Sequence, residues 1–494
     1  MAEEAKRFPE IHRGRRPGDV FLRRPRLRRL ALHRVLGVPG LFSSAYGNVG
    51  SSIYYALGVT ALYALGLTPL VFVISGLFFG ATALSYAEGT AAMPEAGGSA
   101  AFARRAFRPI IAFTVGWAQL LNYMVTVAIS AFVVANYLSV FWEPLGDWPN
   151  NTFFGIGVVA FLVGMNVIGV QESSRFNIVM AIVDLLTQAL IVILGLLILF
   201  NLPILLDNVS FGTVPTWEGF LLGLAVSMIA YTGIETVSNL AEETRNPAKN
   251  IPRSVFSVFA TVLVLYALIP AVALSAFPVD KAAGTTDLVE RFIDQPILGI
   301  VSQLQLPGGF QVSLEMWVGI LVATILLIAT NAGMMGMSRL AYSMGQHKQL
   351  PPQVSRLHPT RRTPVTALLV FGVISALLII PGEVKILANA YIFGAMLSFT
   401  FAHLSIIALR VKEPNMERPF RIPFNLPIRG RSIPLTAVLG AAVTTFAWTV
   451  VVATQQSGRI IGFSWLAAGL LVYLAYRWYK RRYPAAGGSD EIAP

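Results

Sequence analysis

Asp184 is the residue of this sequence best placed to do chemistry, because it is a carboxylate inside a long apolar run. Val183, Leu185 and Leu186 beside it are apolar, and Gln188 follows one helical turn later. On a helix, Asp184 and Gln188 would share a face. Ionisable side chains within a membrane segment are rare and are functional candidates by default. Such a carboxyl could exchange a proton or bind a cation; alternatively, donors of a neighbouring helix could cap it in a structural role.

Two polar stretches that contain glycine also interrupt apolar segments. They are residues 47–55 (GNVGSSIYY) and residues 230–235 (AYTGIE). Lipid cannot hydrogen-bond a freed backbone, so irregular backbone at membrane depth must line a cavity or be buried in protein. Two broken helices are the best sequence indication of a transporter's substrate site. Either stretch alone could instead reflect close helix packing through small residues.

Other polar residues in apolar segments have weaker claims to a function. Glu235 is the last residue of the second interruption and could bond the freed amides there. Asn331 is harder to satisfy within its own helix than the serines and threonines near it. His403 is expected to be a packed, hydrogen-bonded histidine, with a proton relay as the alternative. Glu88 falls near the end of a segment and is expected to be structural.

An enzyme is not indicated, and neither is a cofactor or a metal site. The five histidines have no metal-ligand spacing, and the chain has no cysteine. No glycine-rich loop with a lysine is present to hold ATP phosphates. Transport by this chain would therefore draw on an ion or substrate gradient.

The elements that must position these residues are membrane helices. The 494 residues are 55% hydrophobic and only 13% charged, about half the charged share of a soluble protein. Continuous apolar runs near ~20 residues predict helices rather than a β-barrel. The sequence predicts an all-α membrane protein with about 12 transmembrane helices. The expected spans are 39–65, 69–92, 108–140, 153–170, 177–202, 217–241, 254–277, 313–344, 365–381, 386–409, 434–453 and 459–478.

The positive charges predict which ends of these spans face the cytoplasm. All but four of the 37 lysines and arginines fall in the two tails or in alternate connections between spans. The four exceptions are Lys281, Arg291, Lys385 and Arg459. The excess of positive charge on one side predicts a multi-pass protein with both termini in the cytoplasm. Connection 278–312 would be external.

The expected organisation is one permease domain, residues 39–480, between two cytoplasmic tails, 1–38 and 481–494. The first tail is strongly basic, with the run Arg23-Arg24-Pro25-Arg26-Leu27-Arg28-Arg29. It could bind anionic lipid, although a topology signal on a solvated tail is the simpler interpretation. The charge distribution gives no reason to expect a nucleic-acid partner.

Four groups of motifs resemble the amino acid–polyamine–organocation (APC) superfamily of permeases, over nearly the whole chain. Residues 49–54 (VGSSIY) resemble the family's Ile-Gly-Ser-Gly-Ile-Phe in the first helix. The other groups are 86–88 (YAE) with 93–99 (MPEAGGS), 230–235 with 242–247 (EETRNP) and 250–253 (NIPR), and Asn331 with 338–340 (SRL) and 350–352 (LPP).

The resemblance implies the APC fold: a five-plus-five inverted repeat, 39–202 and 217–409, with helices 1 and 6 broken. Two C-terminal helices, 434–478, would be appended. It also implies alternating access around a central site. Amides of the first broken helix would hold a substrate carboxylate, and carbonyls of the sixth would hold its ammonium, as helix-end charges favour. Transferred to the matching positions of this sequence, the resemblance implies the substrate-binding residues Gly50, Ser51, Ser52, Ile229, Ala230, Tyr231 and Gly233. The ion-coupling residues would be Asp184 and Asn331.

Three residues depart from the family pattern. Ser52 replaces the motif's second glycine, which crowds the amide cradle and favours a small substrate. Ile229 stands where many relatives have a gating aromatic residue. Asp184 falls where proton-coupled relatives have a lysine, so the charge is inverted and the coupling ion, H⁺ or Na⁺, stays open.

The sequence thus predicts an ion-coupled secondary active transporter of amino acids or related organic cations in the plasma membrane. An inorganic cation importer of the same fold, similar to potassium permeases, is the first alternative. A nutrient sensor that does not transport is the second, with the basic tail as its signalling part.

Overall fold

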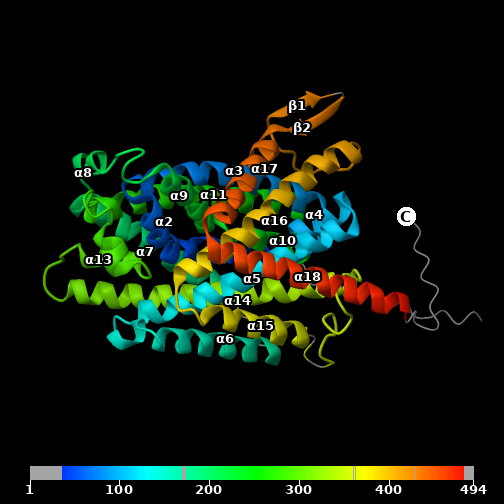
Figure 1. Ribbon diagram of the computed structural model, residues 1–494, viewed down its shortest axis with the longest axis horizontal. Helices are drawn as coiled ribbons and strands as arrows, with labels where there is room; N and C mark the ends of the chain where they lie inside the picture. The colour runs from blue at the N-terminus through cyan, green and yellow to red at the C-terminus, as the bar shows by residue number, and fades with distance from the viewer. Residues whose placement is uncertain (1–35, 170–173, 360, 362, 429, 483–494) are drawn as a thin grey trace, which may run out of the picture. The chain divides into compact units, whose positions relative to one another are not determined.

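The computed structural model describes residues 36–169, 174–359, 361, 363–428 and 430–482, and these are mostly helical (Figure 1). The α-helices are α1 Val38–Val49, α2 Ile53–Ala64, α3 Thr68–Ala92, α4 Ser99–Ala106, α5 Pro109–Leu138, α6 Asn150–Ile168, α7 Ser174–Ile198, α8 Leu202–Asp207, α9 Trp217–Ser227, α10 Glu235–Asn239, α11 Pro247–Ala276, α12 Asp287–Phe292, α13 Pro296–Ser302, α14 Phe310–Gln346, α15 Val365–Ile379, α16 Val384–Lys412, α17 Leu435–Thr454 and α18 Gln456–Arg482. Short 3₁₀ turns are η1 Gly50–Ser52, η2 Leu65–Leu67, η3 Glu143–Gly146, η4 Met228–Tyr231 and η5 Ala241–Glu243.

Ten helical stretches among the described residues are long and apolar enough to cross a membrane. The first of them, Val38–Ala92, covers two of the predicted spans, because the chain turns at η2, where Leu65 has a φ of 44°. Helix α15 is apolar but has only 15 residues. The chain is therefore a multi-pass membrane protein built from helices.

Large apolar side chains on the peripheral helices point outward. Phe153 on α6, Leu197 on α7, Val373 on α15 and Leu471 on α18 are all more than half exposed. In water such surfaces would be unfavourable, but lipid is as apolar as these side chains. The outward faces of these helices are consequently the lipid-facing surface of the protein.

Helix α5 lies at the centre of the packing, and every residue of its most apolar stretch is buried. It packs against α14 on one side and α16 on the other, with α4, α6, α15 and α18 also in contact. Helix α1 packs against α11, α7 and α14, and α2 packs against α9. Segments far apart in sequence thus meet around α1, α2 and α9, which carry the two predicted interruptions.

The predicted external connection 278–312 contains two short helices, α12 and α13. Both contact α2. The backbone approach there is close, because a Cβ atom on Gly58 would lie only 2.0 Å from the carbonyl oxygen of Ile293. This connection therefore packs directly onto α2.

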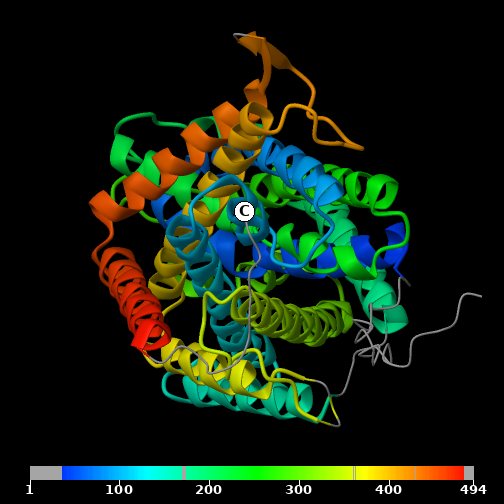
Figure 2. The same ribbon diagram turned by 90° about the vertical axis from the view of Figure 1, so that its right-hand side faces the viewer.

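The sequence did not predict the short helices α4 and α8, nor an antiparallel hairpin of β1 Asn425–Ile428 and β2 Arg431–Pro434. The hairpin follows α16 and projects beyond the helices near the end that carries α4 (Figure 1). Figure 2 views the protein from that end. Most of the predicted basic tail, residues 1–35, and most of the C-terminal tail, residues 483–494, lie outside the described residues.

Candidate functional site

The first predicted interruption is a 3₁₀ turn, η1, between α1 and α2. The backbone stays right-handed through it, with φ −62° and ψ −30° at Gly50 and φ −69° and ψ −24° at Ser52. The hydroxyls of Ser51 and Ser52 donate to the carbonyl oxygen of Asn48 at 2.9 and 3.2 Å. These two side chains therefore donate within their own helix, and Ser52 Oγ also lies 2.9 Å from the Tyr55 hydroxyl.

The second interruption is a larger departure from helical geometry. After η4, Thr232 is extended, with ψ 155°, and Gly233 has a φ of 115°, a value that side-chain-bearing residues rarely adopt. The carboxylate of Glu235 accepts the freed amide of Gly233 at 2.9 Å and a hydrogen bond from Asn122 Nδ2 at 2.8 Å. Glu235 thus has the partner expected of a residue that stabilises the interrupted backbone.

The two interruptions face each other. Asn48 Nδ2 donates to Thr236 Oγ1 at 3.0 Å, and a Cβ atom on Gly233 would lie 3.0 Å from the amide nitrogen of Val49. Turns η1 and η4 are in contact. The structure therefore brings together the predicted substrate-binding residues of both segments. All of them are buried: Gly50, Ser51, Ser52, Ile229, Ala230, Tyr231 and Gly233.

Tyrosines that sequence reasoning did not select surround this junction. Tyr391 accepts hydrogen bonds from Thr126 at 2.8 Å and from Thr232 at 2.7 Å. Tyr266 donates to the carbonyl oxygen of Val49 at 2.5 Å. A tyrosine in mid-span needs a partner for its hydroxyl, so its presence in an apolar segment was a usable signal.

The aromatic neighbour of the second interruption is Tyr231 itself. Its ring stacks on Phe79 with centroids 5.4 Å apart and meets Tyr266 edge-on at 5.2 Å. Its hydroxyl donates to the carbonyl oxygen of Phe72 at 2.6 Å. Ile229 stands at the position where many relatives have a gating aromatic residue. It is fully buried and, as an isoleucine, supplies no aromatic ring.

Asp184 lies on α7 against α1 and α2, completely buried. Its carboxylate accepts hydrogen bonds from Tyr54 at 2.5 Å, Tyr46 at 3.0 Å and Gln188 at 2.8 Å. Asp184 and Gln188 share a helix face, as their spacing indicated. Within the described residues, all three partners of Asp184 are neutral donors, and none of them is a basic side chain.

Gly50 connects this carboxylate cluster to the first interruption. Its carbonyl oxygen lies 3.4 Å from Gln188 Nε2, in hydrogen-bonding geometry. A Cβ atom on Gly50 would lie 2.8 Å from Cζ of Tyr46, the residue that donates to Asp184. Glycine at this position leaves room for the Tyr46 ring. A side chain at residue 50 would displace that ring and with it the hydrogen bond from Tyr46 to Asp184.

The second predicted ion-coupling residue has a different partner. Asn331, on α14, accepts a hydrogen bond at 2.6 Å from Asn166 on α6. No hydrogen bond between described residues joins Asn331 to Asp184. The structure therefore places these two polar residues in separate contacts, and Asp184 is the one next to the interrupted segments.

His403 and Glu88 occupy structural positions. His403 is fully buried on α16, with its ring nitrogens 3.1 Å from Thr82 Oγ1 and 2.9 Å from Ser85 Oγ. Gly440 gives this ring its space, since a Cβ atom there would lie 2.3 Å from it. Glu88 is paired with Arg410 in a buried ion pair at 2.6 Å. In the described part of the chain, no group of three histidine or acidic side chains is placed to hold a metal ion.

Comparisons with known proteins identify the family of this chain. The profile of the family described as amino acid permease matches residues 36–476. The branched-chain amino acid permease BcaP of Bacillus subtilis is 27% identical over 425 residues, which are 82% of this chain and 84% of that protein. The low-affinity putrescine importer PlaP of Escherichia coli is 27% identical over 429 residues, again 82% and 84%. The mouse b(0,+)-type amino acid transporter 1 is 24% identical over 421 residues, 83% of this chain and 82% of that protein.

The family match covers the helices that carry both interruptions, Asp184 and the tyrosines around them. Members of this family are transporters and not enzymes, in agreement with the sequence prediction. The resemblance drawn from the motifs is confirmed: this membrane protein belongs to the amino acid permease family of the APC superfamily.

Proposed function

We propose that this protein is a secondary active transporter that moves amino acids or related organic cations across the plasma membrane by alternating access. The observation that carries the proposal is the contact between the two interrupted segments of this amino acid permease. Turn η1 contacts η4, and α1 contacts α10. Relatives named for branched-chain amino acids and for putrescine indicate the substrate class.

In this proposal the helices form two inverted repeats, α1 to α7 and α9 to α16, followed by α17 and α18. Helices 1 and 6 of the repeat are the broken ones. The backbone amides around Gly50, Ser51 and Ser52 hold a substrate carboxylate, and the carbonyls around Ile229, Ala230 and Gly233 hold its ammonium. Because every one of these residues is buried, substrate entry requires the surrounding helices to move.

Asp184 is the proposed ion-coupling residue. It is buried, its partners in the described structure are neutral, and it reaches η1 through Gln188 and Tyr46. A proton or a cation such as Na⁺ bound there would stabilise one arrangement of α1 against α7. Asn331 is retained as a weaker coupling candidate, because its contact with Asn166 links α14 to α6.

Uptake into proteoliposomes is the direct test of the proposed function. Purified protein is reconstituted and supplied separately with radiolabelled leucine, putrescine and rubidium under an imposed proton or sodium gradient. Accumulation of leucine or putrescine above empty vesicles is the expected result. Accumulation of rubidium alone would favour the inorganic cation importer, which the oxygen-rich surroundings of Asp184 also suit. Uptake of none of the three would contradict the proposal.

The proposed orientation places both termini and the connection 346–364 in the cytoplasm, and 278–312 outside. Single cysteines at the exposed positions Gln353 and Ala283, Gln353→Cys and Ala283→Cys, test it in this cysteine-free chain. An impermeant maleimide added to intact cells is expected to label Ala283→Cys and to label Gln353→Cys only after permeabilisation. The reverse pattern would invert the topology, and the unsubstituted chain is the control for background labelling.

A further inference from the structure

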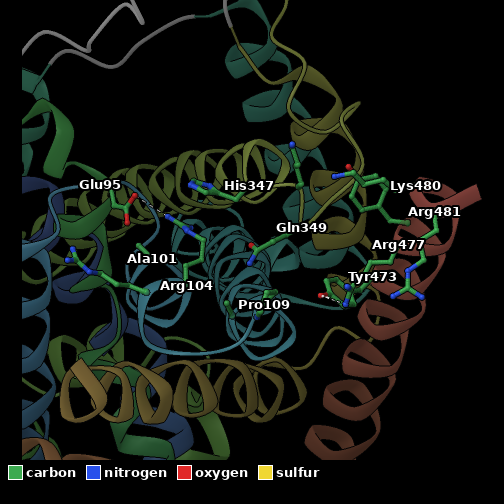
Figure 3. A pocket seen from close by; sticks show the side chains of 14 residues that line it. Glu95, Ala101, Arg104, Pro109, His347, Gln349, Tyr473, Arg477, Lys480 and Arg481 are labelled. Atoms are coloured by element: carbon green, nitrogen blue, oxygen red, sulfur yellow. Dashed lines mark hydrogen bonds and ion pairs between the residues drawn. The ribbon is translucent and has the colours of Figure 1, made fainter. Parts of the chain in front are cut away.

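A basic cavity lies away from the interrupted helices, at the end of the protein that carries α4. Its volume is about 720 Å³, and it is bounded by α4, the start of α5, the end of α14 and the last turns of α18. Figure 3 shows Arg477, Lys480 and Arg481 on α18 on one side, and Arg104 and Gln349 on the other.

The positive charge of the cavity exceeds the acidic charge available to it. Among the described residues, six lysine and arginine side chains line it, against one carboxylate, Glu95, and one of the six, Lys348, has another partner. Glu95 forms an ion pair with Arg104 at 3.2 Å, and Arg105 is bound on its other side by Glu413 outside the cavity. Helix α18 contributes three of these cations, Arg477, Lys480 and Arg481. No acidic residue of α18 lines the cavity. An anion is therefore the complementary ligand.

Two buried polar atoms in the cavity lack hydrogen-bond partners. The amide oxygen of Gln349, a residue only 5% exposed, has none. Nη2 of Arg104 is near Glu95 but outside hydrogen-bonding geometry. Burial lowers the pKa of the Arg104 guanidinium, and the nearby Glu95 carboxylate opposes the change. Buried polar atoms are normally satisfied, which points to a ligand that accepts from Arg104 and donates to Gln349.

The cavity also lies beside the lipid-facing surface. Helix α18 is the most exposed of the candidate spans, with 22% of its most apolar stretch buried. Its last turns carry Trp478, which is 57% exposed, with the Arg482 guanidinium 5.1 Å from the ring. Tryptophan and arginine at the end of a span are typical of the membrane–water interface. A ligand in the cavity could thus extend acyl chains along α18.

We propose that this cavity binds the phosphate and hydroxylated headgroup of an anionic phospholipid. The phosphodiester would lie between Arg104 and the cations of α18, and a headgroup hydroxyl would donate to Gln349. Basic pockets between membrane helices are known to hold lipid headgroups of this charge. The proposal rests on α18 ending at the membrane surface and is independent of the transported substrate.

The test is lipid binding to the purified full-length protein, measured by native mass spectrometry during titration with phosphatidylglycerol or phosphatidylcholine. Phosphatidylglycerol is expected to bind preferentially. The double variant Lys480→Ala/Arg481→Ala should weaken its binding roughly 25-fold, since each basic residue near an anionic surface contributes about fivefold. Gln349→Leu should weaken it roughly fivefold through the lost hydrogen bond. Arg431→Ala, on the exposed hairpin, is the matched control and should bind as the unsubstituted protein does.

Three results would overturn the proposal. Equal binding of phosphatidylglycerol by the double variant and the control would mean that the cavity is not the lipid site. Displacement of the lipid by millimolar inorganic phosphate would mean that a soluble anion is the ligand. Binding that appears only after removal of residues 484–494, which include Asp490 and Glu491, would mean that the chain's own acidic end is the occupant.

Discussion

Asp184→Asn is expected to reduce uptake of substrate against a gradient strongly. Asparagine keeps the shape of the side chain and one oxygen to accept from Tyr54 or Tyr46, but it carries no charge and exchanges no proton. If Asp184 couples an ion to transport, this loss removes the driving force and leaves the substrate site in place. Concentrative uptake should fall between roughly 5- and 150-fold, the usual range of coupling between two sites.

Counterflow exchange separates coupling from substrate binding in this experiment. Proteoliposomes preloaded with unlabelled substrate need no ion gradient to take up the labelled form, so Asp184→Asn should retain most of this exchange. Asp207→Asn is the matched control, because Asp207 is an exposed aspartate whose only ion pair in the described structure is with Lys281. It should leave both measurements unchanged.

An Asp184→Asn protein that still concentrates substrate, with the original pH and cation dependence, would show that Asp184 is structural. Loss of counterflow together with uptake, in a protein that is still folded, would place Asp184 in substrate binding instead. Glu235, which accepts from Asn122 and the Gly233 amide, and His403, which contacts Thr82 and Ser85, would then be the next coupling candidates.

Among the variants proposed for this protein, Glu88→Gln is expected to lose the most stability. The Glu88 carboxylate accepts from Arg410 Nε at 2.7 Å and Nη2 at 2.6 Å, and from the backbone amide of Ile422 at 2.8 Å. Arg418 Nε lies 3.4 Å away. These side chains are almost fully buried, so removal of the carboxylate charge leaves two buried guanidiniums without their counter-ion. Breaking a buried pair in this way costs about 3–5 kcal/mol.

The loss of stability can be measured as the thermal midpoint of the monodisperse protein in detergent. Glu413→Gln is the matched control, since it breaks the ion pair between Glu413 and Arg105 at the protein surface. Exposed pairs contribute about 0–1 kcal/mol, so this control should barely shift the midpoint. Equal shifts for the two variants would mean that the Glu88 cluster does not hold α3 to the segment after α16.

The membrane-spanning helices and the irregular backbone at Gly233 could be predicted from the sequence alone. In lipid, backbone groups must be satisfied within the segment, so apolar runs of sufficient length predict helices from local pattern alone. The same rule singled out Gly233, whose positive φ only glycine adopts easily, and the helical period placed Gln188 beside Asp184. The family motifs are local in the same sense, and their assignment is confirmed.

Which polar groups meet became clear only from the folded structure. Asp184 bonds Tyr54, 130 residues away, and Glu88 bonds Arg410, 322 residues away. Asn331 contacts Asn166 rather than Asp184, and the hairpin after α16 has no apolar run to predict it. A buried polar side chain must find a partner, but its own sequence neighbourhood does not specify which one. That choice depends on how the helices pack, which a local pattern does not contain.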